Sequence, residues 1–262
     1  MQKIKVFNNN ELQNGFNGVG IKIKRMKIGE IVDNFKVPPH PSNIILEGNL
    51  VRLEPLKADK HSVHLFESNA IDKEEINWTY LPYGPFETVE KYADWIKEFE
   101  KGNDPVFLAI IRKSDSKPVG IASYLRIKPN DGSIEVGHIN YSPLLQNTTE
   151  GTEAMFLMMK WAFENGYRRY EWKCNALNIK SRNAAQRLGL SYEGVFRQIG
   201  IKKGRNRNTA WFAAIDKEWK DLKKCFENYL SDDNFDERKL PKVSLSSLTK
   251  PILYKLDNME FS

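Results

Sequence analysis

Apolar positions in the middle of the chain recur with two different periods, which predict strands and helices in mixed order. Residues 49–55 alternate apolar and polar side chains, as a half-buried strand does. Further strands are expected at 106–112, 119–127, 134–141, 168–174, 192–202 and 209–215. Helical spacing predicts helices at 87–100, 151–165, 179–188 and 218–229. Strands that alternate with helices in this order predict a mixed α/β sheet.

Both ends of the chain differ from this pattern. The first 43 residues are rich in asparagine and end with Pro38, Pro39 and Pro41, so we expect an irregular arm with one short strand at 20–25. The last residues form a polar stretch with a weakly apolar end. The expected organisation is therefore an arm over 1–43, one α/β domain over 44–230 and a tail over 231–262.

Charge and cysteine content narrow the setting but not the function. A formal net charge of +6 favours anions in general, and it does not choose between nucleic acid, acidic protein and a phosphorylated cofactor. The sequence lacks an apolar run of the roughly 20 residues needed to cross a bilayer, and its first ten residues do not resemble a secretory signal. Two cysteines, Cys174 and Cys225, are typical of a reducing compartment. We expect a cytoplasmic or nuclear protein without a membrane partner.

The segment between the strand at 134–141 and the next helix has the composition of an anion-binding loop. Small and hydroxylated residues from Gln146 to Gly151 leave backbone N–H groups open at a helix start, where the helix dipole is positive. Such a loop can bind a pyrophosphate. Thr148 or Thr149 could instead serve only to cap the helix, and the loop alone does not decide between the two.

The order of the motifs along the chain favours the pyrophosphate-binding loop. The chain reads GHINYSP at 137–143, the loop at 146–151, TEA at 152–154, Asn178-x-x-Ser181 followed by Arg187-Leu188-Gly189, and EGVFRQ at 193–198. Over 46–229 this order resembles the GNAT acetyltransferases, especially the branch with the Rim-type ribosomal-protein N-terminal acetyltransferases. The resemblance implies acetyl-CoA as co-substrate and a GNAT fold, a mixed seven-stranded sheet flanked by helices. It also implies that the sheet splits like a V between the strands at 134–141 and 168–174.

The resemblance also implies which residues bind acetyl-CoA. A backbone N–H near Ile139 or Asn140 would meet the thioester carbonyl. One residue departs from the family pattern, because Thr149 stands where a glycine is usual, which predicts a different loop path or weaker binding unless its hydroxyl binds phosphate. The full expected set is Ile139, Asn140, Tyr141, Gln146, Asn147, Thr148, Thr149, Glu150, Gly151, Thr152, Asn178, Ser181, Asn183 and Arg187.

Acetyl transfer to an amine benefits from a base, because a free alkyl amine is protonated near neutral pH. Glu135 is the first candidate, and alternation places it on one face with Gly137. His138 is the rival candidate, which a regular strand would direct to the opposite face and a bulge would not. Ser181 is the candidate acid for the leaving thiolate, since Ala185 stands where many GNAT enzymes have a tyrosine.

Three functions remain open at this point. The first is an N-acetyltransferase in which a small-molecule or peptide amine attacks acetyl-CoA directly in a ternary complex, so that Cys174 is a buried strand cysteine rather than a nucleophile. The second is a GNAT-fold module that binds acetyl-CoA without turnover. The third is a nucleic-acid contact through the basic turn at 202–207, which we interpret instead as a solvated hairpin tip. We expect a monomer or homodimer and no metal, because the four histidines form no ligand spacing with the cysteines.

Overall fold

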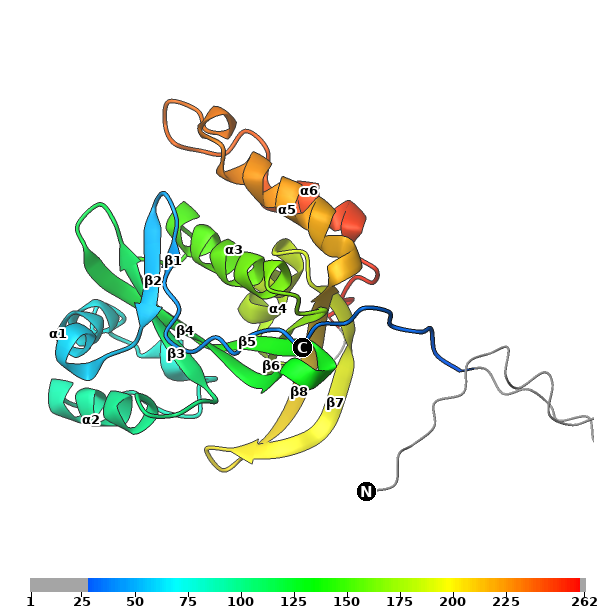
Figure 1. The fold of residues 1–262 in the computed structure, drawn as a ribbon. Coiled ribbons are helices and arrows are strands. Elements are labelled where there is room, and N and C mark those ends of the chain that lie inside the picture. The colour runs from blue at the N-terminus through cyan, green and yellow to red at the C-terminus, as the bar shows by residue number, and fades with distance from the viewer. Residues whose placement is uncertain (1–27, 260–262) are drawn as a thin grey trace, which may run out of the picture. The chain divides into compact units, whose positions relative to one another are not determined.

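The computed structural model describes residues 28–259, and a single mixed sheet organises the chain from Lys36 onward (Figure 1). Contacts divide the chain into two units, 1–35 and 36–262. The strand expected at 20–25 lies outside the described residues. The strands are β1 (Leu46–Glu47), β2 (Val51–Pro55), β3 (Val106–Arg112), β4 (Lys117–Lys128), β5 (Ser133–Tyr141), β6 (Arg169–Asn175), β7 (Ser191–Lys202) and β8 (Arg205–Ile215).

Helices pack on both faces of this sheet. The α-helices are α1 (Ala58–Asn69), α2 (Val89–Phe99), α3 (Thr149–Glu164), α4 (Ile179–Arg187), α5 (Asp216–Leu230) and α6 (Leu245–Thr249), and the short 3-10 turns are η2 (Ile76–Trp78), η3 (Pro129–Asp131), η4 (Asp232–Asn234) and η5 (Lys250–Ile252). Alternate residues of β3 separate the two layers. Phe107 and Ala109 join the core under α1 and α2, whereas Leu108 and Ile110 join the core with α3 and α5.

The strand order is β1-β2-β3-β4-β5-β6-β8-β7, and only the β5–β6 pair among the described strands is parallel. Its register extends only from Ser133 opposite Arg169 to Val136 opposite Trp172. Both strands continue beyond this point, to Tyr141 and Asn175, without pairing to each other. The sheet therefore opens where the V-shaped split was predicted, which confirms the expected fold. The described sheet has eight strands rather than seven because the two-residue β1 pairs with β2.

Several elements differ from the sequence-based prediction, and three of the differences bear on the site and its surroundings. Helix α1 was not predicted, because its buried side is largely polar and includes His61, Ser62 and Asn69. Helix α3 begins two residues early, at Thr149. The basic turn expected over 202–207 has only two residues, Lys203 and Gly204, with φ of 47° and 70°. Positive φ at both positions is typical of a tight hairpin turn, so the remaining basic residues belong to the strands.

The residues after α5 belong to the second unit and pack against α4 and α5. Leu245 of α6 is buried in the core shared with α3 and α5. The Arg182 guanidinium of α4 forms two hydrogen bonds to the Asp257 carboxylate, at 2.7 and 2.6 Å, and both side chains are fully buried. Within residues 28–259, no helix combines the length and apolarity that crossing a bilayer requires.

Candidate active site

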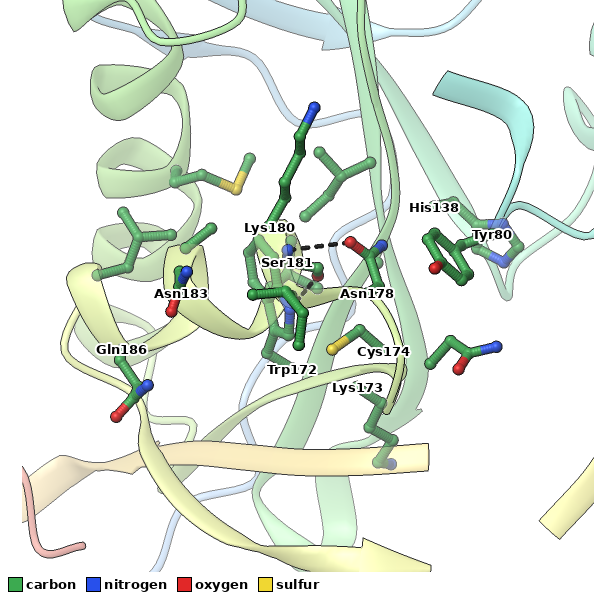
Figure 2. A pocket seen from close by; sticks show the side chains of 18 of the residues that line it. Tyr80, His138, Trp172, Lys173, Cys174, Asn178, Lys180, Ser181, Asn183 and Gln186 are labelled. Atoms are coloured by element: carbon green, nitrogen blue, oxygen red, sulfur yellow. Dashed lines mark hydrogen bonds between the residues drawn. The ribbon is translucent and has the colours of Figure 1, made fainter. Parts of the chain in front are cut away.

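A cavity of about 1530 Å³ follows the split between β5 and β6. Its wall combines the ends of these strands with the starts of α3 and α4, the β7–β8 hairpin, the segment at 76–82 and part of the residues after α5. Figure 2 shows the α4 side of this cavity, with Ser181 and Asn178 near Trp172 and with His138 and Tyr80 beyond them. The cavity therefore joins the residues predicted for the cofactor to those predicted for catalysis.

Strand β5 contains a bulge where the two strands separate. Ser123 of β4 lies opposite Gly137, but Ile121 lies opposite Asn140, so β5 has one extra residue, and His138 has φ of 51°. His138 and Ile139 have no register partner on β4, and β5 has no partner on β6 beyond Val136. Regular pairing is therefore interrupted at the point of β5 where the family resemblance places the donor to the thioester carbonyl.

The bulge also determines where His138 points. The His138 ring stacks on Tyr83 at 5.6 Å and lies 5.2 Å from the ring of Phe107. Phe107 pairs with Ser123, and Glu135 pairs with Leu125, so these residues share the sheet face that carries α1 and α2. Of the two alternatives that the sequence left open, the structure has the bulge: the extra residue reverses the alternation and places His138 on the same face as Glu135.

Glu135 is a buried carboxylate held between two cations. One carboxylate oxygen accepts a hydrogen bond from Arg126 at 2.7 Å, and the other lies 2.8 Å from the Lys173 ammonium. Lys173 also bonds Glu171 at 2.7 Å and lies over the Trp211 ring. Burial raises the pKa of Glu135, and this effect exceeds the opposing attraction of Lys173 and Arg126. A carboxylate whose pKa is raised is a better proton acceptor than an exposed one.

The His138 imidazole has the opposite shift. Burial lowers its pKa to about 4, and the nearby charges of Arg126 and Arg207 act in the same direction. The ring is therefore neutral at neutral pH, and its Nδ1 is buried without a hydrogen-bond partner in the described part of the chain. Its low basicity makes His138 the weaker of the two candidate bases.

The start of α3 is an open helix N-terminus. Thr148 is the N-cap, and its hydroxyl accepts a hydrogen bond from the Gly151 N–H at 3.1 Å. Among the described residues the N–H groups of Thr149 and Glu150 have no acceptor. The loop thus contains both features that the sequence left as alternatives, a capped helix and free donors.

Glycine is not needed at position 149, although it is needed at 151. Thr149 is the first helical residue, and its φ is not positive. At Gly151, in contrast, a Cβ would lie 2.8 Å from the Leu145 carbonyl oxygen and 2.8 Å from the Tyr141 ring. The loop path therefore accommodates the threonine that departs from the family pattern.

Helix α4 places Ser181 at the split. Asn178 caps this helix by accepting the Ser181 N–H at 3.1 Å, and the Ser181 hydroxyl oxygen accepts the Trp172 indole N–H at 3.0 Å (Figure 2). The hydroxyl proton of Ser181 is not used in this bond, and the hydroxyl also lies within hydrogen-bond reach of the Cys174 thiol. Cys174 also lines the cavity, where burial raises the pKa of its thiol to about 11. Ala185 is fully buried in the core.

The structure brings most of the predicted site residues to one cavity. The lining includes Glu135, His138, Ile139, Tyr141, Gln146, Asn147, Thr148, Gly151, Thr152, Asn178, Ser181, Asn183 and Arg187. Three predicted residues are not in the lining: Asn140, Thr149 and Glu150. The Asn140 side chain is buried, and its pairing with Ile121 places it on the α1–α2 face. Only its backbone could serve the role predicted for it.

Several lining residues were not found from the sequence. They include Arg126, Trp172, Lys173, Arg207, Trp211 and Lys250. Strand alternation could have placed Glu171 and Lys173 on one face of β6, but the register that sets them beside Glu135 is not visible in the sequence. Arg207 was assigned to the turn, and the residues after α5 were given no part in the site.

Comparisons with known proteins agree on one family. The family model of the acetyltransferase (GNAT) domain matches residues 51–191. A crystal structure of a GCN5-related N-acetyltransferase from Brucella melitensis is 40% identical, with a TM-score of 0.81, and the match covers 84% of this chain and 100% of that one. No curated protein sequence matches this chain.

Two further structures extend the comparison. One, described as a GNAT-family acetyltransferase from Chromobacterium violaceum, is 35% identical with a TM-score of 0.70, over 75% of this chain and 98% of that one. Another, described as a ribosomal-protein-serine acetyltransferase from Vibrio cholerae, is 15% identical with a TM-score of 0.58, over 66% and 98%. At that identity the second likeness concerns the fold alone.

Proposed function

Because this chain belongs to the GNAT family and is an acetyl-CoA-dependent acyltransferase, we propose that it transfers acetyl directly to a primary amine within a ternary complex. The observation behind this proposal is the placement of Glu135 and Ser181 along one cavity at the split between β5 and β6. Glu135 belongs to the sheet face under α1 and α2, and Ser181 lies at the start of α4 on the other side. An acceptor and a thioester can thus meet between them.

The chemistry of the lining fits acetyl-CoA, which supplies an acetyl thioester and three phosphate groups. Free N–H groups at the α3 start and the positive end of its dipole suit a pyrophosphate. Arg187 donates to the Thr152 hydroxyl at 3.0 Å, which places its guanidinium beside this helix start. Asn178 and Asn183 line the cavity next to it and would bind the remaining length of the co-substrate.

Each proposed catalytic residue handles one proton or one charge. Glu135 takes a proton from the acceptor nitrogen as that nitrogen bonds to the carbonyl carbon. A backbone N–H of the bulge, at Ile139 or Asn140, stabilises the charge that develops on the carbonyl oxygen. The carbon–sulfur bond breaks, and Ser181 donates its hydroxyl proton to the thiolate, then regains one from water. No bond to the protein forms, which leaves the Cys174 thiol without a catalytic role.

One assay separates this proposal from a module that binds acetyl-CoA without turnover. Release of free coenzyme A thiol is measured over a panel of primary amines, and the acetylated amine is identified by mass spectrometry. We expect amine-dependent release, with unchanged protein mass after incubation with acetyl-CoA alone, and Cys174→Ala should retain turnover. An acetylated protein, or loss of turnover in Cys174→Ala, would contradict direct transfer. A rise in melting temperature with acetyl-CoA but no release with any amine would favour the binding module.

A further inference from the structure

The cavity lining is strongly cationic. Among the described residues, seven cationic side chains line it against one carboxylate, that of Glu135: Arg126, Lys173, Lys180, Arg187, Lys202, Arg207 and Lys250. The excess of positive charge in this one cavity equals the formal net charge of the whole chain, +6. A cavity with such a lining concentrates anions and disfavours cations.

Only part of this charge lies where the co-substrate phosphates are expected. Lys180 and Arg187 belong to α4, and Lys250 belongs to the 3-10 turn after α6, which packs with α4 and α5. The other four cations come from β4, β6 and the β7–β8 hairpin, on the side where Glu135 lies. Two of them, Arg126 and Lys173, are paired with Glu135 itself. Lys202 and Arg207 remain in excess.

Arg207 is the most informative of these residues. It is half-buried, and its Nε donates to the Thr209 hydroxyl at 3.1 Å, but it forms no ion pair with any residue in 28–259. Burial lowers the pKa of this guanidinium, and Arg126 adds to the effect while Glu135 opposes it. A half-buried cation without a counter-ion is unfavourable, so an anion bound here would be stabilised.

The fold holds this cation toward the reacting groups. The Lys203 ammonium, in the hairpin turn, donates to the Trp78 and Gly84 carbonyls at 2.9 and 3.1 Å. This anchors the hairpin tip against the segment that walls the cavity. Arg207 and Lys202 both act on the pKa of His138, and Arg207 also interacts with Glu135. The excess positive charge therefore lies close to the proposed base.

We propose that the acceptor is a primary amine bearing an anionic group, a carboxylate or a phosphate, a few bonds from the nitrogen, and that Arg207 and Lys202 bind that group. This inference rests on the proposed function and names its substrate class. Polyamines would be poor acceptors, because their additional cations would meet four positive side chains and only one carboxylate in this part of the lining.

Matched acceptors test the inference. The rate of coenzyme A release is compared for β-alanine against β-alaninamide and for O-phosphoethanolamine against ethanolamine, with spermidine as the polycation. We expect kcat/KM to favour the anionic member of at least one pair by about tenfold or more. The pair that shows the larger preference distinguishes carboxylate from phosphate. Equal use of charged and neutral members, or preferred use of spermidine, would overturn the inference while the proposed function stood.

Two arginines of the same hairpin provide matched variants. Arg207→Gln should reduce the anionic-to-neutral ratio of kcat/KM by about tenfold. Arg205→Gln makes the same charge change at an exposed position outside the lining, and it should preserve the ratio. An unchanged ratio in Arg207→Gln would show that the anion binds elsewhere.

Absence of turnover with every acceptor would contradict the proposed function instead. Calorimetric binding of O-phosphoethanolamine and β-alanine then still tests the anion site. Binding of either compound that is weakened in Arg207→Gln and preserved in Arg205→Gln would support the site. Equal binding by both variants and the parent protein, or no binding to the parent protein, would overturn it.

Discussion

At the scale of single residues, Glu135 should determine the rate of proton removal. The conservative variant Glu135→Gln keeps the size of the side chain but cannot accept a proton. We expect kcat/KM to fall by roughly 10² to 10⁴, as for a lost general base, while acetyl-CoA still binds. The loss should shrink as pH approaches the pKa of the acceptor amine, because the amine then arrives deprotonated. Steady-state rates against pH, with acetyl-CoA affinity from calorimetry, measure both effects.

His138→Gln is the comparison that decides between the two candidate bases. The pKa of His138 is lowered to about 4, so its imidazole is a weak base at neutral pH. We therefore expect His138→Gln to reduce kcat/KM less than Glu135→Gln does. A severe loss in His138→Gln combined with near-normal rates in Glu135→Gln would reverse the assignment. If neither variant changes the rate, the amine loses its proton to bulk water, and the site acts by positioning.

The same histidine should make the free energy of unfolding depend on pH. In the folded protein its pKa is about 4 instead of 6.5. Between these values the unfolded chain binds a proton that the folded chain does not, so stability is highest above pH 6.5 and falls as pH decreases toward 4. Titration of His138 alone changes the free energy of unfolding by at most about 1.4 kcal/mol per pH unit. The charges that face it belong to Arg126, Arg207, Lys202 and Asp104.

We therefore expect His138→Gln to flatten the decrease of stability between pH 6.5 and 4. Urea unfolding at several pH values measures this pH dependence of the free energy of unfolding. The control is His64→Gln, a change at an exposed histidine of α1. Because His61 is also buried and has a lowered pKa, some slope should remain in the variant. An identical slope in the parent protein and in His138→Gln would show that the pKa of His138 is not lowered in the folded protein.

At the scale of elements, the start of α3 should bind the pyrophosphate. The test is Thr149→Glu against Thr149→Gln, because position 149 is helical and partly exposed. A new negative charge about 4 Å from a phosphate costs on the order of 1 to 4 kcal/mol, so acetyl-CoA affinity should fall roughly fivefold to a thousandfold. The neutral variant controls for size, and circular dichroism reports the fold. Equal affinity in both variants would show that the phosphates do not lie beside the side chain at position 149.

Position 151 is less suitable for this test. A side chain there would meet the Leu145 carbonyl oxygen and the Tyr141 ring, whose hydroxyl donates to the Gly151 carbonyl at 2.8 Å. Any substitution at Gly151 therefore disturbs the junction between β5 and α3 as well as ligand binding. Its effect on affinity could not be separated from its effect on packing.

Most elements could be predicted from their apolar period, and the errors have local causes. Strand β2 and helix α3 have clear periods and β3 is a continuous apolar run, whereas α1 buries polar residues such as His61, whose ring bonds Glu54 at 2.9 Å. A period measures apolarity only, so it cannot detect a helix whose buried side is satisfied by hydrogen bonds. The bulge at His138 stayed an open alternative for the same reason, since it depends on one backbone dihedral and on pairing with β4.

The residues of the candidate site were predictable where each belongs to a short local sequence motif. Glu135, the 146–151 loop and Ser181 each follow a readable motif. Lys173 and Arg207 do not, because their importance arises from register between strands far apart in sequence. The charge of the cavity is thus a property of the assembled sheet, and the net charge of +6 gives no measure of it.

At the scale of the whole molecule, the residues after α5 are connected to the site through α4. Asp257 pairs with Arg182, and its backbone N–H donates to Gln186 at 2.9 Å. The Thr249 hydroxyl donates to the Arg187 carbonyl at 3.1 Å. Because α4 also contains Ser181, the helix that positions the proposed acid is held by a segment about 70 residues later in the chain.

Asp257→Asn should therefore reduce stability and acetyl-CoA affinity together. The substitution removes one charge of a fully buried pair that has two hydrogen bonds, and it costs about 3 kcal/mol or more. For a domain of this size that lowers the melting temperature by roughly 6 to 12 °C. Because the anchor of α4 is weakened, we also expect weaker acetyl-CoA binding at a temperature where the variant is folded. Asp233→Asn, at an exposed position of η4, is the matched control for both measurements. A lower melting temperature with unchanged affinity would mean that the buried pair stabilises the fold without positioning α4, whereas a decrease in both would support the inference that the pair positions α4 for acetyl-CoA binding.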